Sequence, residues 1–225
     1  MSTFFTSDIH WNHANICRGT SKWYSDNCRN FNSLEEMNEF LINQINKYVG
    51  QDDVLYNLGD ATFGGIEAIW NLRKQLNVKT IHYVYGNHCH HYKRNRELPN
   101  CYYVSPLDRI GAGVGGIKDG PKGSYYGVYV HDLFASTQDV IFTKIENHQF
   151  FMSHYPHVSW DGSNRGVIML HGHEHGGLNY MNEDCKRLDV GIDSAYKILG
   201  EYKPFSLEEV LQITETKPVL KLGHH

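Results

Sequence analysis

The chain has 225 residues, of which 40% are hydrophobic and 20% charged, and its formal net charge is −4 with histidine neutral. This composition predicts a soluble globular domain, because no stretch approaches the roughly 20 apolar residues of a membrane-spanning helix. Lysine and arginine are spread out, which disfavours a long nucleic acid as the partner, since duplex-binding proteins usually present a basic face.

The two ends of the chain and its cysteines bear on its location. The first residues carry no basic segment and no cleavage site, so a secretory signal is not expected. The five cysteines are scattered without a CxxC pair, which favours reduced thiols over a disulfide framework. We therefore expect a cytoplasmic protein. Residues 222–225 can be the remnant of a purification tag, and one domain is expected over residues 1–221.

The first predicted elements are a strand and a helix. Residues 3–7 are short, β-branched and aromatic, so they predict a buried strand that ends at Asp8. Residues 34–49 form the clearest predicted helix. Ser33 and Glu36 match a capping box, and one face of the helix carries the apolar residues Leu34, Met37, Leu41, Ile45 and Tyr48.

Two further strands end in the same way. A strand at 54–58 stops at Gly59-Asp60, and after a helix at 66–76 a strand at 80–85 stops at Gly86-Asn87. In each case a hydrophobic strand ends and a residue type that binds metals follows. Open α/β sheets place their ligands at the carboxyl ends of strands, so these residues are expected at one edge.

The second half of the chain continues the pattern after a less regular segment. Residues 104–138 are rich in glycine and predict an insertion on a compact frame. Residues 139–145 and 149–153 then predict an antiparallel hairpin, and a strand at 167–170 follows. A last helix is expected to start at Ser206, again with a capping box.

Five short motifs follow the predicted strands in a fixed order: Asp8-Ile-His10, Gly59-Asp60, Gly86-Asn87-His88, Ser153-His154 and Gly172-His173-Glu-His175. A single Asp-x-His or Gly-Asp is more often a strand end followed by a turn, but the ordered set is not expected by accident. Carboxylates, imidazoles and one amide are the ligands of a two-metal site. Without thiolate they favour Mn, Fe, Zn or Ni over Ca or an iron–sulfur cluster.

These motifs resemble those of the calcineurin-like metallophosphoesterases in order and in every ligand type, from Phe4 to about Val210, and most of all the small bacterial and phage members. The resemblance implies an α/β fold, a four-layer αββα sandwich of two mixed sheets flanked by helices. It also implies the ligands. One metal would be held by Asp8, His10 and His175, the other by Asn87, His154 and His173, and Asp60 would bridge the two.

The resemblance further implies that His88 faces the substrate and stabilises or protonates the departing oxygen. The chain departs from the family at the next residue, where Cys89 stands in place of the usual Asp or Glu. A thiol orients a neighbouring imidazole less well than a carboxylate does. We expect this change to affect the protonation state of His88 and to leave the metal site intact.

The expected activity is hydrolysis of a small phosphodiester, phosphomonoester or nucleotide, because two cations about 3.5–4 Å apart can hold a phosphoryl group and generate hydroxide. Manganese is the metal we expect first. The alternatives are a hydrolase of pyrophosphate bonds and a catalytically silent protein-binding scaffold. Candidate substrate contacts are His13 and Asn15, which can equally be polar loop residues, and Arg165, which can be an ordinary solvated arginine.

Overall fold

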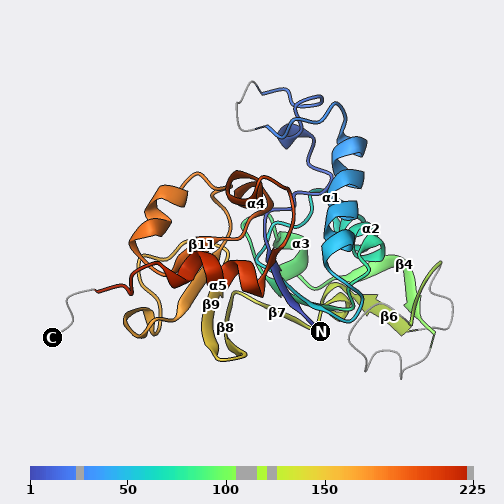
Figure 1. The fold of residues 1–225 in the computed structure, drawn as a ribbon. Coiled ribbons are helices and arrows are strands. Elements are labelled where there is room, and N and C mark those ends of the chain that lie inside the picture. The colour runs from blue at the N-terminus through green and yellow to red at the C-terminus, as the bar shows by residue number, and fades with distance from the viewer. Residues whose placement is uncertain (24–27, 105–115, 121–125, 222–225) are drawn as a thin grey trace.

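The computed structural model describes residues 1–23, 28–104, 116–120 and 126–221 (Figure 1). Much of the segment expected as an insertion, and the four residues interpreted as a tag remnant, lie outside these ranges. Two mixed β-sheets form the centre of the molecule, and a third, smaller sheet lies beside the first. None of the described helices has the length and apolar character that crossing a bilayer requires.

The first sheet has five strands in the order β12-β1-β2-β3-β7. Strands β1, β2, β3 and β7 run parallel, and β12 joins β1 antiparallel at one edge. The three strands predicted in the first half of the chain are confirmed, with ends within one residue. The bounds are Thr3–Thr6 for β1, Val54–Asn57 for β2, Thr80–Val84 for β3, Ser136–Gln138 for β7 and Phe205–Ser206 for β12.

The second sheet has four strands in the order β11-β10-β9-β8. The predicted hairpin is confirmed, because β8 and β9 pair antiparallel along their whole length, whereas β9, β10 and β11 are parallel. The bounds are Val140–Ile145 for β8, His148–Ser153 for β9, Ile168–His171 for β10 and Arg187–Asp189 for β11.

A hydrophobic core joins the two sheets face to face. Phe5 of the first sheet and Phe150 of the second are both fully buried, and their ring centroids lie 5.6 Å apart. Met152 and Leu170 belong to the same buried cluster. This packing fixes the two sheets relative to each other, so loops at their ends hold constant positions across the interface.

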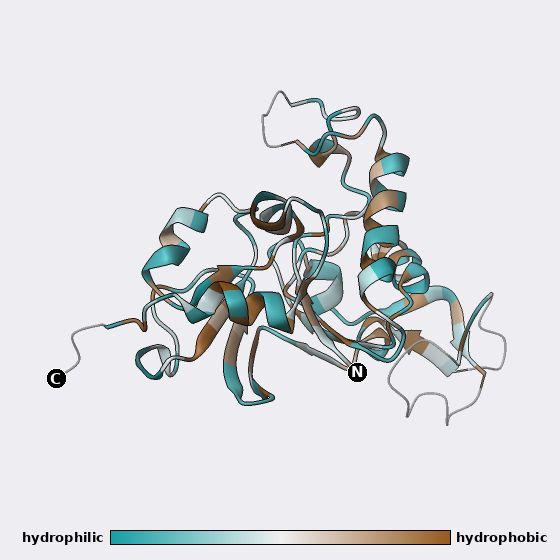
Figure 2. Ribbon diagram, in the orientation of Figure 1, coloured by the Kyte–Doolittle hydropathy of each residue, from teal (hydrophilic) through white to brown (hydrophobic). Residues whose placement is uncertain are grey.

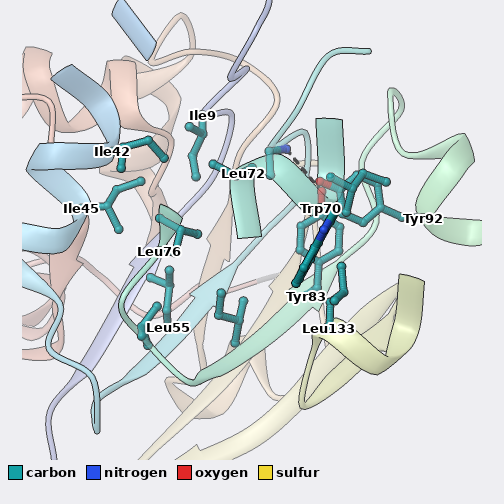
Figure 3. Packing of buried hydrophobic residues seen from close by; sticks show 14 of the residues in the cluster. Ile9, Ile42, Ile45, Leu55, Trp70, Leu72, Leu76, Tyr83, Tyr92 and Leu133 are labelled. Atoms are coloured by element: carbon teal, nitrogen blue, oxygen red, sulfur yellow. Dashed lines mark hydrogen bonds between the residues drawn. The ribbon is translucent and has the colours of Figure 1, made fainter. Parts of the chain in front are cut away.

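Helices α1 (Leu34–Tyr48) and α2 (Ile66–Gln75) cover the outer face of the first sheet (Figure 3). Ser33 caps α1 by accepting the N–H of Glu36, as predicted, but the Glu36 carboxylate accepts from Asn32 instead of closing the capping box. Figure 2 shows hydrophobic and hydrophilic residues alternating along α1, as expected for a helix with one buried face.

Helices α4 (Ile192–Leu199) and α5 (Leu207–Glu215) lie near the edges where the two sheets meet. The capping box predicted at Ser206 is present at the start of α5. An α/β sandwich with mixed sheets is therefore confirmed. Helices were also expected on the outer face of the second sheet. Irregular segments that carry Trp160, Cys185 and Leu220 pack there instead.

The third sheet is antiparallel and consists of β4 (Glu97–Tyr103), flanked by β5 (Ile117–Asp119) and β6 (Tyr126–Tyr129). A short helix, α3 (His90–Lys93), leads into it. The Trp70 indole N–H of α2 donates to Asp119 at 2.7 Å, which ties this sheet to the main body. Strand β4 precedes residues 104–138, the segment expected as an insertion, and the bounds of that insertion stay a prediction.

Candidate metal centre

The loops that follow β1 and β2 run side by side at the carboxyl ends of the first sheet. The Asp8 N–H donates to the Gly59 carbonyl at 3.0 Å, and the His10 N–H donates to the Asp60 carbonyl at 3.0 Å. Both carboxylates are almost fully buried. The parallel strands therefore deliver Asp8 and Asp60 to one place, as the sequence predicts.

The loop after β10 brings the second sheet against this pair. Gly172 donates its N–H to the His154 carbonyl at 3.0 Å, and the next N–H, that of His173, donates to Asp8 Oδ2 at 2.8 Å. A Cβ at Gly172 would lie 2.0 Å from Ser7 Oγ. Only glycine allows the two loops to approach this closely, which gives the glycine of the Gly-His-x-His motif a physical reason.

The first group of converging ligand atoms belongs to Asp8, His10 and His175, whose donor atoms all lie within 4.8 Å of one another. The Nε2 atoms of His10 and His175 are 3.7 and 3.9 Å from Asp8 Oδ1. This oxygen is buried and meets no hydrogen-bond donor in the part of the chain that the structure describes. A buried carboxylate oxygen without a donor is costly, and a cation between these three groups would satisfy it.

A second group lies directly beside the first. The donor atoms of Asp8, Asp60 and His154 are within 4.8 Å of one another. Asn87 Oδ1 is 3.0 Å from His154 Nε2 and 2.9 Å from His173 Nδ1, so Asn87 and His173 belong to the same cluster as His154. The carboxylate common to the two groups is that of Asp8, whereas the sequence predicts a bridge at Asp60. The bridging role of Asp60 stays a prediction.

The orientation of His154 supports a cation in the second group. Its Nδ1 lies 2.8 Å from the Leu58 carbonyl, which can only accept, so this nitrogen carries the proton and donates. In the neutral ring Nε2 then directs a lone pair at Asp60 Oδ2, 3.3 Å away. Two acceptors in contact repel each other unless a proton or a metal ion lies between them.

The electrostatics of the cluster agree with this geometry. Burial by itself would raise the pKa of Asp8, but the imidazoles of His10, His175 and His154 hold it well below its usual range. Burial likewise lowers the pKa of His154, yet the neighbouring carboxylates raise it above the ordinary value. The carboxylates are thus ionised at neutral pH and attract positive charge, which protons on histidine or metal ions can supply.

The backbone at these positions is unusual. Nine non-glycine residues of the described chain have a positive φ, and five of them are predicted ligands. These five are Asp8 (53°), His10 (49°), Asp60 (49°), His173 (72°) and His175 (49°). Left-handed backbone is unfavourable for residues with a Cβ, and its clustering at one place is typical of functional sites.

A buried arginine that the sequence did not single out ties the first group together. The Arg29 guanidinium donates to both oxygens of Asp193, each at 2.8 Å, and to the carbonyls of Asp8 and Ile9 at 2.7 and 2.6 Å. Asp193 Oδ2 in turn accepts from His175 Nδ1 at 2.6 Å. This leaves His175 Nε2 to face Asp8, the arrangement in which a carboxylate orients a metal-binding histidine.

Cys89 acts on Asp60. Its Sγ lies 3.3 Å from Asp60 Oδ1, and the Asp60 N–H donates to the same sulfur at 3.4 Å. Burial, with the nearby Asp60 carboxylate, raises the pKa of the thiol to about 12, so Cys89 stays protonated and donates. The presence of Cys89 in place of an acidic residue is expected to affect His88. Among the described residues, however, the thiol contacts Asp60 and Tyr83.

His88 lies at the exposed side of the cluster. Its N–H donates to Asp60 Oδ1 at 3.0 Å, and its ring centroid is 5.7 Å from that of His10. His13 belongs to the same neighbourhood, because its Nδ1 is 3.2 Å from His10 Nδ1 and its ring stacks on Phe63. Burial and the neighbouring His10 lower the pKa of His13 to about 4, so it is neutral at physiological pH.

The other two candidate substrate contacts are not brought into the cluster by any recorded contact. Asn15 is exposed, and its carbonyl accepts from the Cys28 thiol. Arg165 is exposed and pairs with Asp161 at 3.2 Å. It precedes β10 at the end of the strand opposite His173 and His175. Its contacts match the alternative interpretation of a solvated arginine.

Comparison with known proteins gives distant relatives only, and no family model matches the chain. The chain is 25% identical over 222 residues to an uncharacterized protein of Methanocaldococcus jannaschii, covering 97% of this chain and 94% of the relative. It is 24% identical over 224 residues to the gene 66 protein of Mycobacterium phage L5, covering 92% of this chain and 93% of the relative.

Two solved structures are similar. A protein of unknown function from Aquifex aeolicus matches with a TM-score of 0.54 and 17% identity, over 94% of this chain and 98% of that one. An archaeal phosphodiesterase matches with a TM-score of 0.40 and 17% identity, over 92% of this chain and 100% of that one. The first likeness supports the fold alone, and the second is too weak to support either fold or function.

Proposed function

We propose that this chain is a hydrolase of small phosphoesters that depends on two divalent metal ions. Asp8, His10 and His175 would hold one ion, and Asn87, His154 and His173 the other, with Asp60 bridging. The observation that carries the proposal is the buried Asp8 Oδ1, which faces the Nε2 atoms of two histidines and has no donor among the described residues.

The residues around the cluster fit this chemistry without a covalent intermediate. Bound metal ions would act as Lewis acids toward a phosphoryl group and lower the pKa of water. Asp60 is held in place by the His88 N–H and the Cys89 thiol through one oxygen, so its other oxygen stays directed at His154. His88, on the exposed side, can protonate the leaving oxygen as a general acid.

Manganese is the proposed native metal, and iron, zinc and nickel suit the same ligands. The cluster combines imidazole nitrogen with carboxylate and amide oxygen, a set that these borderline cations bind better than calcium or a soft thiophilic metal does. Cys89 supplies no thiolate, because burial and Asp60 keep its thiol protonated.

The proposal is tested by metal content and turnover measured on the same preparations. Protein stripped with chelator and reloaded with Mn²⁺ is expected to bind two ions and to hydrolyse chromogenic phosphoesters. Asp60→Asn is expected to lower turnover by more than about 100-fold. Mutation of a residue that only orients a metal ligand typically lowers metal affinity or activity by about 10–100-fold, and Asp60 is a proposed direct ligand. Asp52→Asn, at an exposed carboxylate paired with Lys79, is the matched control and keeps both properties.

The role of His88 has its own test. His88→Ala is expected to lower turnover by about 10²–10⁴-fold, the range typical of general acid catalysis, while two metal ions remain bound. Loss of metal from this variant would contradict the role assigned to His88. Two bound ions with no turnover of any phosphoester by the unmodified chain would support a binding scaffold instead.

A further inference from the structure

Two cavities adjoin the Gly86-Asn87-His88 turn. The His88 pocket, of about 230 Å³, is lined by His88 together with Phe63, His91 and Tyr92. The Asn87 pocket, of about 450 Å³, is lined by Asn87 together with Tyr85, Lys93, Asp139 and Tyr155. His90 lines both pockets, so they lie side by side along the turn. Together they fall within the roughly 300–1,000 Å³ typical of small-molecule sites.

Both pockets adjoin the metal cluster itself. Asn87 is in contact with two predicted ligands, and His88 hydrogen-bonds a third through its N–H. Tyr155 of the Asn87 pocket packs with its ring centroid 4.7 Å from that of His173. A larger cavity of about 800 Å³ lies elsewhere, lined by residues such as Met1 and Leu211, and contains none of the ligands. Of these three cavities, the two smaller ones are therefore those that lie beside the candidate ligands.

The two pockets differ in character. The His88 pocket has no acidic side chain, lysine or arginine in its lining, and its walls include the rings of Phe63 and Tyr92. Burial lowers the pKa of His91, which keeps that imidazole uncharged at neutral pH. A second phosphate placed there would lose its hydration and would find no lysine or arginine in the lining to replace it. The pocket therefore suits a flat, uncharged group and disfavours the pyrophosphate alternative.

The Asn87 pocket is polar. Lys93 pairs with Asp139 at 2.9 Å, and its ammonium group also lies 5.4 Å from the centre of the Tyr85 ring. The charges of Lys93 and Asp139 offset each other, so the pocket offers hydrogen-bonding groups of both kinds beside aromatic rings. These are the features that bind a sugar or nucleoside, which presents hydroxyls and a ring.

We propose that the substrate is a phosphodiester whose two organic arms occupy these two pockets. The flat leaving arm would lie in the His88 pocket and the polar retained arm in the Asn87 pocket. This inference rests on the proposed function. In the reaction a water molecule releases a proton to solvent as its oxygen bonds to phosphorus, the bond from phosphorus to the leaving oxygen breaks, and that oxygen takes a proton from His88, which regains one from solvent. The other arm stays esterified, and no oxidant or reductant is needed.

The test uses three substrates with one leaving group, so that only the retained arm changes. These are p-nitrophenyl phosphate, methyl p-nitrophenyl phosphate and the p-nitrophenyl ester of thymidine 5′-phosphate. We expect kcat/KM to rise in that order. From the methyl to the thymidine diester the expected rise is about tenfold or more, because the thymidine arm can form a few hydrogen bonds in the Asn87 pocket. Lys93→Met is expected to lower kcat/KM for the thymidine diester more than for the methyl diester, and so to reduce this preference.

A variant in the other pocket tests the leaving arm. Gly65 lines the His88 pocket, and a Cβ there would meet nothing within 4 Å, so Gly65→Leu adds an apolar side chain at the pocket wall without a clash at its Cβ. We expect it to slow all three substrates at least tenfold, because they share the p-nitrophenyl leaving arm, with two metal ions still bound. Hydrolysis of the monoester in preference to both diesters, or equal loss on all three substrates in Lys93→Met, would overturn this inference and leave the metal-dependent activity standing. No hydrolysis of any substrate by the metal-loaded chain would instead overturn the proposed function.

Discussion

Asp193→Asn tests the network behind the first metal group. The substitution keeps the size of the side chain but removes the charge that binds Arg29 and orients His175. Partners of metal-binding histidines typically contribute 10–100-fold to metal affinity, so we expect the ion at Asp8, His10 and His175 to bind weaker by about that factor. The second group makes no recorded contact with Asp193 and should keep its affinity.

The same substitution is expected to lower stability, because it leaves the fully buried Arg29 without its counter-charge. Breaking a buried ion pair in this way costs about 3–5 kcal/mol. For a chain of this length that corresponds to a fall in Tm of about 6–20 °C. Burial would raise the pKa of Asp193, but Arg29 and His175 hold it far below its usual range. The stabilisation is thus present above about pH 4, where the unfolded carboxyl is ionised, and is lost as pH falls further.

The assay is a Mn²⁺ titration by equilibrium dialysis on wild type and variant at 10 °C, with thermal melts of the metal-free proteins. We expect two tight ions in wild type and one tight and one weakened ion in the variant. Asp161→Asn is the matched control, since this carboxylate also pairs with an arginine but is 69% exposed. It should change stability by less than about 0.5 kcal/mol. Unchanged binding of both ions by Asp193→Asn would refute the orienting role.

Three further substitutions probe other features of the chain. Gly172→Ala should abolish metal binding in dialysis, because its Cβ would lie 2.3 Å from Asp8 Oδ2; normal metal content would contradict the close approach. Ile45→Ala should lower the urea-derived free energy of unfolding by about 2–5 kcal/mol, since Ile45 is fully buried; a loss under 1 kcal/mol would argue against its core position. Burial raises the pKa of Cys101 to about 11, so stability is lost as pH rises from about 9 to 11, by at most roughly 1.4 kcal/mol per unit. Cys101→Ala should flatten that slope in urea titrations at pH 8–10, and an unchanged slope would contradict it.

The strands and the convergence of the candidate ligands could be predicted because their signals are local. Each strand is a short apolar run, and each candidate ligand directly follows the end of such a run. The apolar pattern and the residues that end it are therefore enough to predict where strands and candidate ligands lie. The helix at Leu34–Tyr48 was equally accessible, because Ser33 marks its start and Met37, Leu41 and Ile45 repeat on its buried face. The parallel pairing of the strands then brings the loops together without further information.

Arg29 and Asp193 could not be predicted in this way. They are 164 positions apart, and Asp193 lies in a helix that was itself not predicted. An arginine in a polar loop most often faces solvent, so only the fold reveals that this one is enclosed. The short helix Ile192–Leu199 was missed for a related reason, since it follows Gly191 with no capping side chain. Strands β4 and β5 of the small third sheet were missed because they pair across a glycine-rich segment.

The distribution of charge explains why the centre needs cations even though the chain as a whole is only slightly acidic. Four buried carboxylates, those of Asp8, Asp60, Asp189 and Asp193, lie within or beside the cluster, and Arg29 is their fixed positive partner among the described contacts. Burial raises the pKa of Asp189, whereas the other three have pKa values below their usual range. Three ionised carboxylates and one guanidinium leave a net negative charge in the desolvated cluster. Two protonated histidines offset this charge, but only at pH values at which they carry a proton. Divalent ions would offset it at any pH at which the histidines are neutral, so the residues that make the metal-free protein electrostatically costly would also give metal ions their affinity.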